Sequence, residues 1–154
     1  MISCTPEEWV KAYEEKRSLY ANFTAKLHKL FEDLLRTHGI EVVQIESRTK
    51  ALESFREKIQ RPGMSYDAPL VQLTDLSGIR IIAYYLQDVD KIGTMIKREF
   101  ESFDKTQITD PDHFGYFSIH YVIALSPSRK QLTEWKSYLD LKAEVQVRTV
   151  LQHA

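Results

Sequence analysis

A segment close to the end of the chain alternates functional and apolar side chains. Because successive side chains of a β-strand point to opposite faces, Glu144, Gln146 and Arg148 would share one face, and Val145 and Val147 the other. A carboxylate can bind Mg²⁺, an amide can recognise a nucleotide, and a guanidinium can bind a phosphate. Taken alone, this segment is more typical of a solvated edge strand with an incidental ion pair, so a functional interpretation depends on other segments.

A second group of functional residues is basic and has helical spacing. Lys50, Ser54 and Lys58 recur at every fourth position and would line one stripe of a helix, next to an apolar stripe that can dock on a sheet. Two ammonium groups with a hydroxyl between them suit a polyphosphate. The simpler alternative is that these lysines form surface ion pairs with Glu53 and Glu57 of the same helix.

Two further charged residues lie at and inside a predicted strand over residues 78–86. Asp75, just before this strand, is a candidate Mg²⁺ ligand only if a second carboxylate such as that of Glu144 is close in space; otherwise it is a turn or cap residue. Arg80 lies within the strand among apolar residues, which is unusual for a charge unless something planar or anionic covers it. Arg48, at the start of the basic helix, could stack on a base.

A predicted strand over residues 115–125 also separates polar from apolar side chains. Tyr116, Ser118 and His120 would share one face, where the tyrosine could stack on a base and the other two could bind ribose or phosphate. A structural histidine with satisfied hydrogen bonds is the alternative for His120.

Composition limits the possible partners. The 154 residues include 43% hydrophobic side chains, and the formal net charge is −1, so no overall electrostatic attraction to a long nucleic acid or an anionic membrane is expected. The single cysteine, Cys4, cannot form an internal disulfide. Without an apolar run of membrane-spanning length or a signal peptide at the start of the chain, a cytoplasmic protein is expected.

The periodicity predicts an α+β fold, with helices packed on a mixed sheet of about five strands. Residues 1–154 are interpreted as a single domain, in which residues 1–39 form an N-terminal helix and residues 40–154 the core. The helix starts at a Thr5 cap and ends at Gly39. The elements predicted after it, in order, are a strand at 42–45, a helix at 48–60, a long connection at 62–77, a strand at 78–86, a helix at 88–100 capped by Asp88, an acidic loop at 102–113, a strand at 115–125, a short helix around Leu132 and Trp135, and a strand at 144–149.

The four functional segments, in order and spacing, resemble the synthetase domain of the RelA/SpoT family, of the small alarmone synthetase type. They are Arg48-Thr49-Lys50 with Ser54 and Lys58, residues 75–80, residues 115–120 and residues 144–149. The resemblance implies a nucleotidyltransferase-like fold. It also implies transfer of pyrophosphate from ATP to the 3′-hydroxyl of GTP or GDP, with release of AMP and with Mg²⁺ as the cofactor.

The same resemblance assigns roles to individual residues. Asp75 and Glu144 would hold Mg²⁺, and Glu144 would also accept the hydroxyl proton. The remaining residues would bind the two nucleotides: Lys50, Ser54 and Lys58 the ATP phosphates, Arg48 and Arg80 the adenine, and Tyr116, Ser118, His120, Gln146 and Arg148 the acceptor.

The chain departs from the family pattern at three places. Phe114 and Phe117 replace an asparagine and a basic residue, the loop 109–113 is acidic, and a helix that starts at Thr149 stops at residue 154, which suggests a truncated chain. A homo-oligomer is expected only if the missing C-terminal part is present. Two alternatives follow: a toxic relative that modifies the 3′ end of tRNA, and a non-catalytic module that senses nucleotides or binds a partner.

Overall fold

A computed structural model of the protein describes residues 4–109 and 117–150. A long helix forms the first part of the described chain. Helix α1 (Pro6–Thr37) begins where the sequence predicts, because the Thr5 side chain accepts a hydrogen bond from the Glu8 amide. It ends just before Gly39, whose φ of 69° is the left-handed conformation that glycine favours. No helix in the described ranges combines the length and apolar composition needed to cross a membrane.

The segment after α1 differs from the sequence prediction in a way that matters for the site. Strand β1 (Val42–Thr49) is longer than predicted, and helix α2 (Leu52–Ile59) starts later. The strand continues because Arg48 and Thr49 pair with the neighbouring strand, and the Lys50 amide then bonds to the Leu76 carbonyl at 2.9 Å. Lys50 therefore lies between the strand and the helix, and the prediction that it begins a helical stripe is wrong.

The remaining elements follow the predicted order with two exceptions, the first of which is a short helix, α3, inside the connection predicted at 62–77. The predicted acidic loop at 102–113 is in large part strand β3, because the backbone pairs with β4 from Phe100 opposite Leu125 to Thr109 opposite Phe117. Asp88 is not the cap of its helix; Tyr85 occupies that position. The other elements are α3 (Pro69–Gln72), β2 (Ser77–Ala83), α4 (Leu86–Glu99), β3 (Phe100–Thr109), β4 (Phe117–Leu125), α5 (Pro127–Lys130), the 3₁₀ helix η1 (Thr133–Tyr138) and β5 (Lys142–Thr149).

The five strands form one mixed sheet in the order β1-β2-β5-β4-β3. Strands β2 and β5 are parallel, and the other neighbouring pairs are antiparallel. The structure thus confirms the α+β class and the mixed five-stranded sheet. Strand β5 lies at the centre of this sheet, so the alternative that it is a solvated edge strand is wrong.

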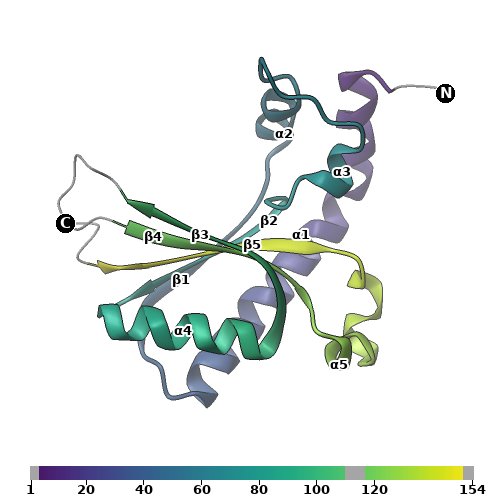
Figure 1. Cartoon of the computed structure of the whole chain (residues 1–154). Coiled ribbons are helices and arrows are strands. Elements are labelled where there is room, and N and C mark those ends of the chain that lie inside the picture. Colours follow the sequence, from purple (N-terminus) through teal and green to yellow (C-terminus); the bar gives the residue numbers. More distant parts are fainter. Residues whose placement is uncertain (1–3, 110–116, 151–154) are drawn as a thin grey trace.

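Helices α1 and α4 lie on the same side of the sheet (Figure 1). The main core forms there, with Val145 and Val147 of β5 completely buried. A second apolar cluster, which includes Tyr13 and Phe55, joins the first half of α1 to α2 and α3. Since alternate side chains of β5 point to opposite faces, Glu144 and Gln146 lie on the face away from α1 and α4.

Close packing of α4 on the sheet depends on a glycine. A side chain at Gly93 would overlap the hydroxyl of Tyr121, which is only 2% exposed. Gly93→Ala is therefore expected to lower the free energy of unfolding by about 1–3 kcal/mol, although alanine is normally preferred in helices. Urea denaturation measures this change. Adding Tyr121→Phe, which removes the overlapping hydroxyl, should recover part of the lost stability. A Gly93→Ala variant more stable than wild type would contradict the packing argument.

Candidate nucleotide-binding site

Polar side chains from four strands meet in register on the open face of the sheet. Glu46 pairs with Arg80, Arg80 with Gln146, and Gln146 with His120, so these residues form one row across β1, β2, β5 and β4. The adjacent row contains Arg48, Gly78 and Glu144. Sheet pairing therefore brings together residues that are about one hundred positions apart in the sequence.

Hydrogen bonds connect the first row to Glu144. The Arg80 Nε donates to the Gln146 Oε1 at 2.7 Å, and the Gln146 Nε2 lies 2.9 Å from the His120 Nε2. The other ring nitrogen, Nδ1, lies 3.2 Å from a Glu144 carboxylate oxygen. With a proton on Nδ1, His120 donates to Glu144 and accepts from Gln146. Each hydrogen bond between Arg80 and Glu144 then has one donor and one acceptor. Ser118 adds a contact at 3.1 Å to the His120 Nε2.

Asp75 is the meeting point of two lysines. The Lys50 and Lys58 Nζ atoms each lie 2.8 Å from the Asp75 Oδ2. Burial acts to raise the pKa of the Asp75 carboxyl, but the two lysines outweigh it and lower that pKa below its usual value. Lys58 thus pairs with Asp75, rather than with the acidic residues of its own helix. The Lys50 ammonium is buried in this arrangement, with the residue only 7% exposed.

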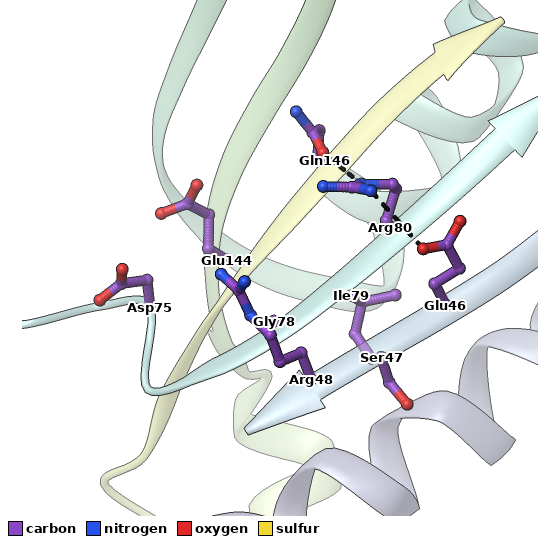
Figure 2. Close-up of a pocket in the computed structure, with 9 residues that line it drawn as sticks. All are labelled: Glu46, Ser47, Arg48, Asp75, Gly78, Ile79, Arg80, Glu144 and Gln146. Atoms are coloured by element: carbon purple, nitrogen blue, oxygen red, sulfur yellow. Dashed lines mark hydrogen bonds and ion pairs between the residues drawn. The ribbon is translucent and has the colours of Figure 1, made fainter. Parts of the chain in front are cut away.

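A cavity of about 340 Å³ lies beside these groups. Figure 2 shows Asp75 and Glu144 at one end and Glu46 and Ser47 at the other, with Arg48 between the ends. This volume falls within the range of small-molecule sites. Its lining is Glu46, Ser47, Arg48, Asp75, Gly78, Ile79, Arg80, Glu144 and Gln146.

The structure brings most of the predicted site residues together, but not all. Lys50 and Lys58 lie outside the cavity lining but contact Asp75, which lines it. Ser118 and His120 also lie outside the lining and bond to Gln146, which belongs to it. Arg148 is buried further along β5, away from that lining. Ser54 is exposed on α2 and is also absent from the lining. The predicted base-stacking residue Tyr116 lies outside the described residues, as do Phe114, residues 110–113 and residues 151–154.

Sequence reasoning missed the residues at the far end of the cavity and those that support Lys50. Glu46 and Ser47 were missed because strand β1 was predicted to end at residue 45; a strand extended to Thr49 would have placed Glu46 on the same face as Arg48. Tyr13 and Arg17 of α1 donate hydrogen bonds to the Lys50 carbonyl. These contacts join residues more than thirty positions apart, and no local sequence pattern predicts them.

The two carboxylates fit a Mg²⁺ site that is completed by a phosphorylated ligand. Within the described ranges, no three His, Cys, Asp or Glu side chains form a metal cluster. Mg²⁺ needs only one or two protein carboxylates when phosphates and water supply the other ligands. The Asp75 Oδ1 is buried and has no hydrogen-bond partner among the described residues, so its lone pairs remain available. Asp75 and Glu144 are therefore suited to hold the metal.

The sheet and its polar face define an α+β domain with a cavity lined by charged and polar side chains. The model described as "Region found in RelA / SpoT proteins" matches residues 47–154, which is more than half of the chain. The chain belongs to the RelA/SpoT family. No curated protein sequence is similar enough to count as a match.

Solved structures share this fold at low sequence identity. A GTP pyrophosphokinase family protein from Streptococcus pneumoniae superposes with a TM-score of 0.74 and 21% identity, over 92% of this chain and 71% of that one. Small alarmone synthetase 1 from Bacillus subtilis gives 0.72 and 19%, over 92% and 73% of the two chains. The same enzyme bound to its product pppGpp gives 0.74 and 19%, over 93% and 76%. These similarities confirm the predicted RelA/SpoT synthetase fold.

Proposed function

We propose that this protein is an alarmone synthetase that transfers pyrophosphate from ATP to the 3′-hydroxyl of GTP or GDP and releases AMP. One observation carries the proposal: Lys50 and Lys58 converge on Asp75, which lines the same cavity as Glu144. Two cations for a polyphosphate and two carboxylates for Mg²⁺ are what such a transfer requires. Membership of the RelA/SpoT family supports the same activity.

In this proposal ATP occupies the cavity. Arg48 and Arg80 come from neighbouring strands and would hold the adenine, while Lys50 and Lys58 would exchange Asp75 for the ATP phosphates. Gly78 stands between Arg48 and Glu144 in the sheet. Because glycine has no side chain, it leaves the floor of the cavity open along the path from the base to the phosphates. The exposed Ser54 would reach the phosphates only at the edge of this arrangement.

The acceptor would approach from β4 and β5, where Ser118, His120, Gln146 and Arg148 are placed, with Tyr116 as the proposed stacking partner of guanine. Its 3′-oxygen forms a bond to the β-phosphorus of ATP, the bond from that phosphorus to the α,β-bridging oxygen breaks, and AMP leaves. Glu144 accepts the hydroxyl proton. Asp75 and Glu144 would hold Mg²⁺, which would supply charge neutralisation for the phosphates. The His120 contact fixes the Glu144 carboxylate in place for this transfer.

The acceptor can be identified by incubating the protein with labelled ATP, Mg²⁺ and GDP, GTP or tRNA in separate reactions. Labelled ppGpp or pppGpp, together with AMP, is the expected product. Transfer to tRNA alone would replace this proposal with the tRNA-modifying function, which the net charge of −1 does not favour. Absence of product with all three acceptors would reject both enzymatic functions in favour of a non-catalytic module.

A further inference from the structure

Two side chains of α1 hold the backbone at Lys50, although α1 precedes the residues that match the family model. The Tyr13 hydroxyl donates to the Lys50 carbonyl at 2.6 Å, and the Arg17 Nε donates to the same oxygen at 3.1 Å. A second guanidinium nitrogen of Arg17 donates to the Thr49 carbonyl at 3.2 Å. The family match begins only at residue 47.

The hydrogen bonds from Tyr13 and Arg17 hold a backbone carbonyl that belongs to neither the neighbouring strand nor the neighbouring helix. Lys50 lies after the end of β1 and before the start of α2, so neither the sheet ladder nor the helix holds its carbonyl. On the other side of the residue, its amide bonds to the carbonyl of Leu76, the neighbour of Asp75. The Lys50 backbone is therefore fixed from both sides, which determines where its ammonium group meets Asp75.

Tyr13 also contacts the helix that carries the second lysine. Its ring is completely buried and stacks on Phe55 of α2, with centroids 4.5 Å apart. Phe55 lies one helical turn before Lys58, so a shift of Tyr13 would move both lysines. Burial, opposed in part by the charge of Arg17, raises the pKa of Tyr13 to about 12, so the hydroxyl keeps its proton at neutral pH.

We propose that Tyr13 and Arg17 are positioning residues for the two phosphate-binding lysines, so that α1 forms part of the ATP site. This inference rests on the proposed function, because it assigns Lys50 and Lys58 to the ATP phosphates. Loss of the α1 bonds should weaken ATP binding and leave the acceptor half of the site unchanged, since His120 and Gln146 lie on strands that these bonds do not touch.

The test compares Tyr13→Phe, Arg17→Met and the double variant with wild type. Isothermal titration with α,β-methylene-ATP and Mg²⁺ gives ATP affinity, and steady-state kinetics give the KM for each substrate. We expect ATP affinity to fall about fivefold in each single variant and at least about tenfold in the double variant. The KM for GDP or GTP should change less than about twofold. Tyr13→Phe keeps the ring that packs on Phe55, so it should fold.

Tyr20→Phe is the matched control, because Tyr20 belongs to the same helix and the same apolar cluster. It removes a hydroxyl and leaves the bonds to Lys50 in place, so ATP affinity should stay at the wild-type value. Wild-type ATP affinity in the double variant, or an equal loss of ATP and acceptor affinity, would overturn the positioning role while the proposed function stands. A wild-type protein that binds no ATP analogue would reject the proposed function, and the inference with it.

Discussion

Asp75→Asn is expected to reduce pyrophosphate transfer by about a thousandfold, the loss typical when one electrostatic contact to a transition state is removed. The substitution removes the charge that Lys50 and Lys58 both contact. It also replaces one of the two proposed Mg²⁺ ligands by a neutral amide. Initial rates with labelled ATP and GDP measure the effect.

Glu53→Gln provides the matched control for this variant. Glu53 is an exposed carboxylate on α2 whose partner is Arg56, on the same helix as Lys58 but outside the cavity lining. The control should retain wild-type activity within about twofold, since exposed ion pairs contribute little. If Asp75→Asn kept full activity, neither the metal role nor the phosphate role assigned to this end of the cavity could stand.

The stability of the same variant tests the lysine contacts without any assay of activity. Because the pKa of Asp75 is lowered in the folded protein, the unfolded chain takes up the proton first as the pH falls. The stabilisation that the charged carboxyl provides is therefore present above its usual pKa of 3.8 and is lost as the pH falls through the lower folded value. The difference in unfolding free energy between wild type and Asp75→Asn should be constant near neutral pH and shift in favour of the variant below about pH 4. A constant difference down to pH 3 would contradict the lowered pKa.

Alternation of side chains along single strands was the part of the site that the sequence could predict well. Val145 and Val147 enter the core, while Glu144 and Gln146 face the cavity, as a period of two requires. The same rule correctly separated His120 from the buried Tyr121. These predictions succeeded because the period of a strand depends on backbone geometry alone.

Residues whose position depends on distant parts of the chain could not be predicted in this way. Lys50, Ser54 and Lys58 have helical spacing, but pairing of β1 with β2 extends the strand through Thr49 and leaves Lys50 before the helix. Lys50 and Lys58 nevertheless meet, because both reach Asp75 from different elements.

The edge strand β3 also depends on a distant part of the chain and could not be predicted from local sequence. Residues 102–109 were included in a predicted loop because of the acidic, turn-rich sequence that follows them, and pairing with β4 makes them a strand. Contacts of this kind depend on which segments the topology places side by side, which no local window of sequence contains.

Glu144→Gln is expected to lower kcat by about a thousandfold while the KM for ATP changes only a few-fold. Glutamine has almost the same shape, and its amide oxygen can still accept the bond from the His120 Nδ1, so the central strand should fold normally. The amide cannot accept the proton of the acceptor hydroxyl, and it is a weaker ligand for Mg²⁺. The loss should therefore fall on the chemical step, which rapid-quench measurement of a single turnover isolates from product release.

Glu46→Gln tests whether the chemistry belongs to one end of the cavity. Glu46 is also a carboxylate in the cavity lining, but it lies at the opposite end from Asp75 and forms an ion pair with Arg80 at 3.5 Å (Figure 2). Both side chains of that pair are 42% exposed, so its loss should weaken ATP binding only a few-fold and leave kcat within about threefold. Equal losses of kcat in Glu46→Gln and Glu144→Gln would mean that any charge change in the cavity is damaging. A large loss confined to Glu144→Gln would support a proton acceptor at the Asp75 end of the cavity, where the two lysines would bind the ATP phosphates in the proposed function.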